Sequence, residues 1–169
     1  MAKTWLSIRV ELIGGRGEQL WPRPGRIFAA STAHTLLDLA TAIDIAFARW
    51  DHAHQHEFEF ADGTRAGIPD PDFPELADID TARTSLRKIT TGELFTYTFD
   101  FGDQWTHQCA IDPRRIDPLD VLGIVPASPT PYWGWGSIPD QYGRRWDDDD
   151  GTGDPPEPPT GGRSLAGRE

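Results

Sequence analysis

Two alternating runs meet at Gly102-Asp103 within residues 93–111, and this pattern constrains the fold more than any other part of the chain. Apolar residues at every second position are typical of half-buried strands, so the segment predicts a β-hairpin. The side chains that share a face are Phe95, Tyr97, Phe99 and Phe101 in the first run, and Trp105, His107, Cys109 and Ile111 in the second.

The turn of this hairpin decides which residues face one another. A two-residue turn would put the two apolar sets on opposite faces of the sheet. A three-residue loop with a bulge would pair Phe101 with Trp105 and bring the sets together. Because burial decides register, we expect the bulged form, with Phe99 opposite His107 and Asp100 on the other face.

Three more strands follow from the same reasoning. Residues 4–13 alternate cleanly and predict a half-buried strand. Residues 19–29 predict a second, broken strand, which Pro22 and Pro24 place at an edge or a bulge. Residues 56–61 alternate again and end at a turn. The turn residues are Gly14, Gly15 and Gly17 after the first strand, and Asp62 and Gly63 before a return strand over residues 64–68.

Residues 34–50 change from a period of two to a period of 3.6, which predicts the one long amphipathic helix of the chain. Ser31 or Thr32 can cap its start. The apolar stripe consists of Leu36, Leu39, Ala40, Ile43, Phe47 and Trp50.

The remaining segments are loops with little regular structure. Residues 69–80 are rich in Pro and Asp, a short helix is expected near residues 81–88, and residues 113–146 form coil with a short helix over 119–122. The order of elements predicts an α+β fold, in which an antiparallel sheet of hairpins packs on one main helix. We expect a single domain over residues 1–146.

Residues 147–169 form an acidic tail with seven acidic and two basic residues, and the whole chain has a net charge of −11. The tail has one apolar residue larger than alanine, so we expect it to be disordered. The folded part stays acidic without it, which disfavours a nucleic-acid partner. The small basic clusters are Arg16, Arg23 and Arg26, and Arg114 and Arg115.

Three further observations concern features that the sequence lacks: a membrane span, a signal peptide and a pair of cysteines. No stretch has the roughly 20 apolar residues of a membrane span, and the N-terminus lacks the apolar core of a signal peptide. The one cysteine, Cys109, excludes an intrachain disulfide. We therefore expect a cytoplasmic protein with no membrane partner.

Four stretches resemble the plasmid pRiA4b ORF-3-like family, whose members are also labelled TnpR-type transposon passenger proteins. The resemblance implies a compact α+β domain over about residues 4–143 and no established activity. The stretches are residues 20–23 (LWPR), residues 46–58 with His54-Gln55-His56-Glu57-Phe58, residues 97–107 (YTFDFGDQWTH), and residues 135–143 (WGSIPDQYG).

The chain departs from the family pattern in the fourth stretch. Paired prolines and a glutamate are reduced there to Pro139 and Asp140, and a preceding cysteine is absent. The resolvase label also lacks support from the residues. A serine recombinase needs a serine amid several arginines and a basic DNA-binding helix, whereas Ser7 has only Arg9 nearby.

Five titratable residues fall within the two best motifs: His54, His56, Asp100, Asp103 and His107. Histidine and aspartate are suitable ligands for Zn²⁺, Mn²⁺ or Fe²⁺, so a divalent metal bound by His54, His107 and Asp103 is one hypothesis. An acid–base site is another, although no complete catalytic set is present.

A structural polar network is the favoured interpretation of the same residues. Asp100 and Asp103 can satisfy the backbone of the hairpin turn. His107 can be a buried histidine that is hydrogen-bonded to a carboxylate, and His54 can cap the carbonyls at the helix end. Under this hypothesis the cluster stabilises the fold and binds no ligand.

The leading functional hypothesis is a non-enzymatic accessory or interaction domain of a mobile-element or plasmid-associated family. Its unknown protein partner would bind through the sheet edge or through Trp133 and Trp135, which could instead pack under the long loop. The alternatives are a metal- or small-ligand-binding protein, possibly hydrolytic in action, and a nucleic-acid-associated protein.

Overall fold

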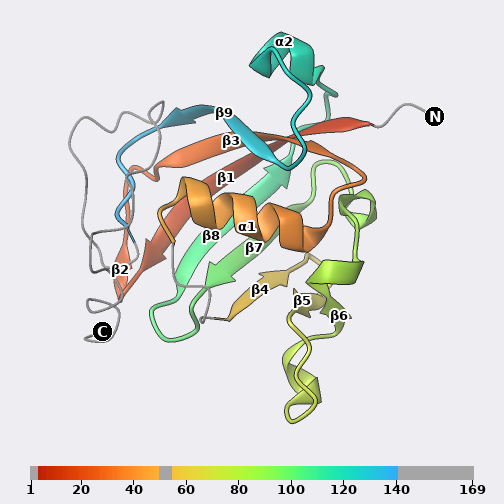
Figure 1. Ribbon diagram of the computed structural model, residues 1–169. Helices are drawn as coiled ribbons and strands as arrows, with labels where there is room; N and C mark the ends of the chain where they lie inside the picture. The colour runs from red at the N-terminus through yellow and green to blue at the C-terminus, as the bar shows by residue number, and fades with distance from the viewer. Residues whose placement is uncertain (1–3, 50–54, 141–169) are drawn as a thin grey trace, which may run out of the picture.

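A nine-stranded sheet with one helix against one of its faces forms the body of the protein (Figure 1). The computed structural model describes residues 4–49 and 55–140. Along the sheet the strands are ordered β6-β5-β4-β7-β8-β1-β3-β9, and β2 pairs with the end of β1. The strands are β1 (Trp5–Gly15), β2 (Glu18–Gln19), β3 (Gly25–Ser31), β4 (His56–Glu59), β5 (Arg65–Gly67), β6 (Ile79–Asp80), β7 (Leu94–Phe99), β8 (Trp105–Ile111) and β9 (Thr130–Trp135).

This architecture confirms the α+β class with one main helix. Every pair of neighbouring strands is antiparallel except β5 and β6, which are parallel, so the sheet is mixed. Two short strands, β6 and β9, were not expected from the sequence. The expected short helix is α2 (Pro118–Leu122), and residues 81–88 form two 3₁₀ turns, Thr81–Arg83 and Leu86–Lys88, in place of one helix.

The helix α1 (Leu36–Ala46) begins later than expected. Ser31 ends β3, and the N-cap is Thr35, whose hydroxyl accepts a hydrogen bond from the Asp38 backbone while the Asp38 carboxylate accepts one from the Thr35 backbone. This reciprocal pair satisfies two otherwise unpaired N–H groups, so the prediction of Ser31 or Thr32 as the cap was wrong.

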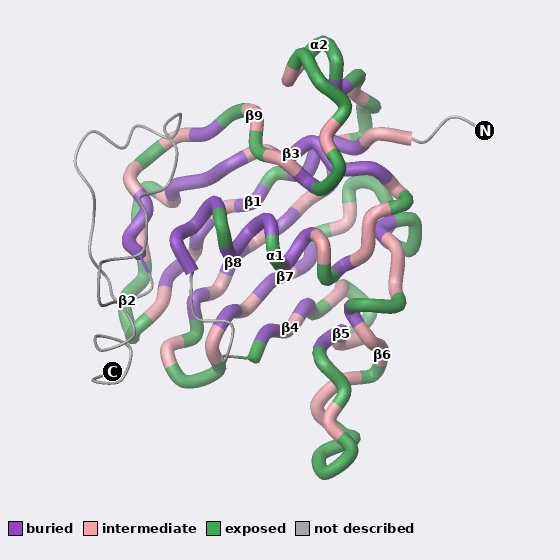
Figure 2. Tube along the Cα trace, viewed as in Figure 1, coloured by how far each residue is buried: buried purple, intermediate pink, exposed green. Residues whose placement is uncertain are grey.

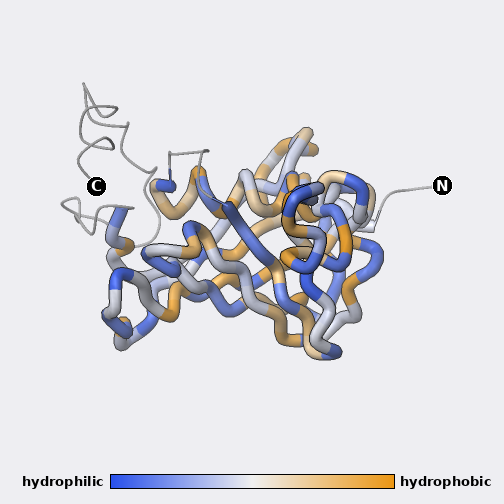
Figure 3. Tube along the Cα trace, turned by 90° about the horizontal axis from the view of Figure 1, so that it is seen from below, coloured by the Kyte–Doolittle hydropathy of each residue, from blue (hydrophilic) through white to orange (hydrophobic). Residues whose placement is uncertain are grey.

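The core lies between α1 and the sheet. Figure 2 shows that buried segments run through α1 and the central strands, and in Figure 3 hydrophobic and hydrophilic residues alternate along the strands. The residues that β1, β7 and β8 direct toward α1 are nearly all buried, whereas those on the opposite face are mostly half-buried or exposed. The second face is only partly covered, because Ser7, Ala29 and Ser31 are buried there while Arg9 is exposed.

The hairpin β7–β8 has the predicted faces but a different register. Phe99 pairs with Trp105 and Tyr97 with His107, so the expected pairing of Phe99 with His107 was wrong. Residues 100–104 form a longer connection, in which Asp100 and Gln104 adopt left-handed φ values of 63° and 53°. A shift of two residues keeps the other side chains on their faces, but Phe101, which was expected on the buried face opposite Trp105, lies beyond the end of β7 and is 39% exposed.

The prolines of the second predicted strand lie between two strands. Pro22 and Pro24 fall in the loop from β2 to β3, and β3 lies between β1 and β9. The expectation of an edge strand was therefore wrong for β3, because the prolines stand outside its hydrogen-bonded ladder. No helix within the described residues has the length and apolar character that a membrane crossing requires.

Candidate functional site

His107 lies on β8 with its side chain fully buried under α1. Its Nδ1 donates a hydrogen bond to the Tyr97 carbonyl oxygen across the sheet, at 3.0 Å, and the Phe47 ring packs edge-on against it. The predicted carboxylate partner is thus replaced by a backbone carbonyl. Burial, reinforced by the positive charge of Arg49, lowers the pKa of His107 to about 3, and its Nε2 has no hydrogen-bond partner.

His56 occupies a similar position on β4, on the other side of β7. Its Nε2 lies 3.1 Å from the Thr81 hydroxyl, and burial lowers its pKa to about 4. The Tyr97 ring lies between the two histidines, with ring centroids 5.9 Å from His56 and 5.5 Å from His107. Two of the predicted site residues therefore meet around a tyrosine, and both are neutral near pH 7.

Tyr97 connects this cluster to a carboxylate on α1 that the sequence analysis missed. The Tyr97 hydroxyl donates a hydrogen bond to Asp44 Oδ1 at 2.7 Å. Burial raises the pKa of Asp44 to about 7, although this hydrogen bond and the nearby Arg49 act in the opposite direction. Asp44 directly follows Ile43, which belongs to the apolar stripe of the helix. The one signal in the sequence for a buried polar partner was Tyr97, because a tyrosine hydroxyl in a buried strand needs a hydrogen-bond partner.

Arg49 is the second residue that the sequence analysis missed, and it is also fully buried. Its Nη1 donates a hydrogen bond to the Pro139 carbonyl oxygen at 2.8 Å, and its guanidinium carbon lies 4.2 Å from the centre of the Trp105 ring. Burial lowers its pKa to about 9, against the opposing effects of Asp44 and the buried Asp140. Nε and Nη2 of Arg49 have no hydrogen-bond partner.

A glycine at the end of β1 makes room for the Trp105 ring. A Cβ atom added to Gly15 would lie 2.3 Å from a Trp105 ring carbon, which is far inside van der Waals contact. Gly15 is therefore required for close approach, so this member of the glycine cluster packs against an aromatic ring instead of marking only a turn.

Replacing Gly15 by alanine is expected to lower the free energy of unfolding by about 1–3 kcal/mol, because the Trp105 ring must move and disturb its stack with Arg49. Urea unfolding monitored by circular dichroism measures this. The penalty should shrink in a Trp105→Ala background, where the ring that a Cβ at Gly15 would meet is gone. An equal penalty in both backgrounds would contradict the proposed contact.

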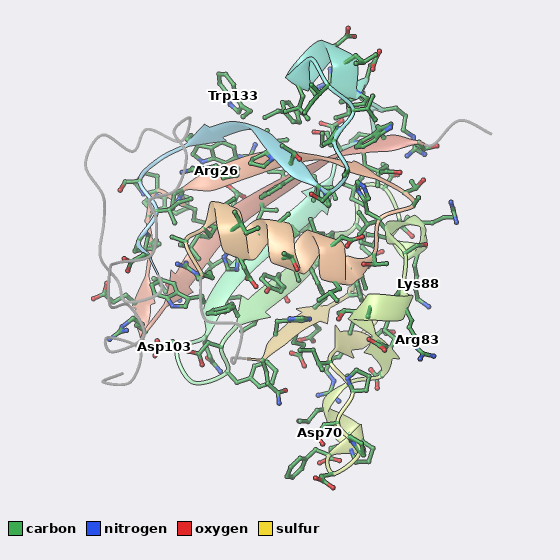
Figure 4. All side chains as sticks on the ribbon, in the orientation of Figure 1. Arg26, Asp70, Arg83, Lys88, Asp103 and Trp133 are labelled. Atoms are coloured by element: carbon green, nitrogen blue, oxygen red, sulfur yellow. The ribbon has the colours of Figure 1, made fainter. Side chains whose placement is uncertain are left out.

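The other predicted residues lie in or near the hairpin turn. Asp100 Oδ1 accepts a hydrogen bond from the Gly102 backbone, and the Asp103 carboxylate lies 3.5 Å from Arg16 at the surface (Figure 4). Asp100 thus accepts from the turn backbone, whereas the contact of Asp103 is with an arginine side chain. His54 falls outside the described residues, so the metal set of His54, His107 and Asp103 stays a prediction. Within residues 4–49 and 55–140, no three His, Cys, Asp or Glu side chains group as metal ligands would.

A surface groove of about 520 Å³ lies beside this turn, between the end of β1 and the β7–β8 connection. It is lined mainly by glycines and polar residues, and none of the buried residues Asp44, Arg49, Tyr97 or His107 contributes to it. The buried polar cluster is therefore separate from this groove.

Trp133 and Trp135 lie on β9, at the edge of the sheet. They pair with Ile27 and Gly25 of β3, so both face away from α1. Trp133 is 60% exposed and projects from the edge of the molecule in Figure 4. The sequence left open whether these tryptophans are exposed or pack under the long loop, and Trp133 is exposed.

Trp135 is held in place by its neighbours. Its Nε1 donates a hydrogen bond to the Arg23 carbonyl oxygen at 2.9 Å, and the Arg9 guanidinium carbon lies 4.4 Å from the ring centre. The half-buried ring lies against Gly25, where a Cβ would come within 2.3 Å. We call Trp133, Trp135, Arg9 and Arg23 the tryptophan surface.

Comparisons with known proteins agree with this description of the fold. The crystal structure of the protein of unknown function MM3350 from Methanosarcina mazei Go1 is similar, with a TM-score of 0.60 and 21% identity over 82% of this chain and 72% of that chain. No curated protein matches the sequence. The family described as "Plasmid pRiA4b ORF-3-like protein" matches residues 5–120, which include Arg49, Tyr97 and His107. The chain therefore belongs to the plasmid pRiA4b ORF-3-like family.

Proposed function

We propose that this chain is a non-catalytic accessory domain that binds an extended protein segment on the tryptophan surface. The observation that carries the proposal is the exposure of Trp133 beside a pre-positioned Trp135 on the sheet face that lies away from α1. Tryptophan and arginine are the residue types that most often supply binding energy in protein interfaces. Here two of each lie together on one face of the sheet, between the central strand β1 and the edge strand β9.

The state of the buried polar cluster supports a binding role over a catalytic one. His56 and His107 are buried, and their lowered pKa values keep them neutral near pH 7. The Asp44 carboxylate is bonded to Tyr97 under α1. Since a catalytic group must come within hydrogen-bond reach of its substrate, this arrangement favours stabilisation of the fold.

The edge position of β9 favours an extended partner. The outer side of β9 has no neighbouring strand in the described sheet, so backbone groups there can pair with a strand of another polypeptide. Pro131 lacks an N–H group and a register shift interrupts the ladder near it. Pairing is therefore expected over the Trp133–Trp135 end of the strand, where side-chain contacts add to the backbone hydrogen bonds.

A display library of random linear peptides, selected against the full-length chain, tests the proposal. Enriched peptides are expected to bind Trp133→Ala at least about tenfold more weakly, as for truncation of an interface hot spot. Phe73→Ala is the matched control, because Phe73 is also an exposed aromatic residue (53%) but lies at the opposite end of the sheet, near Asp70 in Figure 4. Peptides that bind both variants as they bind the wild type, or no enriched peptide at all, would refute the proposal.

A further inference from the structure

The chain contains a proline-rich acidic segment whose chemistry matches the tryptophan surface. Residues 154–159 read DPPEPP, with four prolines and two carboxylates, and lie outside the described residues. Sequences of this kind favour the polyproline II conformation, which costs little entropy to bind. Surfaces lined by aromatic side chains are the usual receptors for such segments in proteins.

We propose that the tryptophan surface binds the chain's own segment 154–159. This inference rests on the proposed function and names a ligand for the side chains of the same surface; because its four prolines lack N–H groups, the segment would pack on the indole rings without pairing with the β9 backbone. The prolines would pack on the indole rings of Trp133 and Trp135, and the two carboxylates would lie near Arg9 and Arg23. The segment would thus occupy the surface until a segment of a partner displaces it.

The charges at the surface are complementary to this ligand. The guanidinium of Arg9 lies over the Trp135 ring, and Arg23 is fixed beside the same ring because its carbonyl oxygen accepts the indole hydrogen bond. Two cationic side chains therefore border the aromatic contact area. Arg9 also forms a salt bridge with Glu11 at 3.3 Å and Arg23 donates a hydrogen bond to Gln108 at 3.4 Å, so the segment would share these arginines with both neighbours. The segment carries Asp154 and Glu157 on either side of its first proline pair. Opposite charges at the rim of an interface favour encounter and correct register.

The length of the connecting chain permits the contact. The described chain ends at Asp140, which is buried, and the adjacent Pro139 is bonded to Arg49. The 14 residues from there to Asp154 can span up to about 45 Å. A domain of this size has a radius of gyration of only about 14 Å, so the segment can reach the opposite face of the sheet. Because a short tether gives millimolar effective concentration, weak intrinsic affinity suffices for occupancy.

Calorimetric titration with a synthetic peptide of residues 152–161 (TGDPPEPPTG) tests the inference. The receptors are the full-length wild-type chain and a full-length variant with serine at Pro155, Pro156, Pro158 and Pro159. We expect the peptide to bind the serine variant at least about tenfold more tightly, because the wild-type segment competes at high effective concentration. Adding Trp133→Ala to the serine variant should abolish binding, whereas adding Phe73→Ala should leave it unchanged.

Equal affinity for both chains would overturn the inference, and so would the absence of binding to either. Circular dichroism spectra of all variants establish that each is folded. A peptide in which the four prolines are replaced by serine must not bind the serine variant; binding of that peptide would also overturn the inference. If library-selected peptides still bind in a Trp133-dependent manner when this test fails, the proposed function stands and only the assignment of the ligand is lost.

Discussion

Replacing Arg49 by methionine is expected to lower the free energy of unfolding by about 3–5 kcal/mol, the usual cost of removing one member of a buried charged group. The substitution removes the hydrogen bond to the Pro139 carbonyl and the stack on Trp105. It also leaves the buried Asp44 without its nearby positive charge. Urea unfolding of wild type and variant measures the loss, which is a large part of the 5–15 kcal/mol typical of a domain.

A double-mutant cycle with Asp44→Asn tests the electrostatic part of this result. If Asp44 and Arg49 stabilise each other, the double variant should lose less stability than the two single variants together, by about 1–3 kcal/mol. The Tyr97 hydroxyl can still donate to the asparagine carbonyl oxygen. Additive losses would mean that Arg49 contributes only through Pro139 and Trp105.

The stability of the protein is expected to fall steeply as the pH drops from about 6.5 to about 4. The pKa values of His56 and His107 are lowered to about 4 and about 3, so in this range the unfolded chain binds protons that the folded chain does not. Each histidine therefore contributes a loss of about 1.4 kcal/mol per pH unit. Asp44 acts in the opposite direction, because its raised pKa lets the folded chain hold a proton up to about pH 7.

Two variants should change this pH dependence with opposite signs. His107→Asn keeps an N–H donor for the Tyr97 carbonyl but removes the titrating ring. The free energy of unfolding should therefore fall less steeply on acidification than in the wild type, by about 1.4 kcal/mol per pH unit. Asp44→Asn removes the group that acts in the opposite direction. Its free energy of unfolding should therefore fall more steeply on acidification than that of the wild type, by about the same amount per pH unit. Urea midpoints between pH 4 and pH 7 measure both slopes. Parallel curves for the three proteins would contradict the burial of these groups.

The elements of the fold could largely be predicted from the sequence, because periodicity reports burial directly. The alternation in residues 93–111 gave both faces of β7 and β8 correctly. It did not give the register, and it placed Phe101 on the buried face, although that residue lies in the connection and is 39% exposed. The left-handed backbone at Asp100 and Gln104 decided the register, and neither residue type announces that conformation strongly.

The site was harder to predict, because its strongest members are charged residues that only tertiary contacts bury. The motifs singled out His56 and His107, which are buried, but not Asp44 and Arg49, which lie on a helix and at its end, where charged side chains are usually exposed to solvent. Arg49 is covered because Pro139, 90 positions later, returns to it. No local sequence pattern around Arg49 predicts this contact with Pro139.

The position of β1 in the middle of the sheet has a consequence for synthesis of the protein. The neighbours of β1 in the sheet are β3 and β8, and Leu12 of β1 pairs with His107 of β8. One side of β1 therefore cannot pair until residues almost 100 positions later have been synthesised. At 5–20 residues per second, this delay is about 5–20 s. During that time the apolar side chains of β1, β3 and α1 have no complete sheet to pack against. The nascent chain is therefore a natural client of chaperones until β8 has emerged from the ribosome.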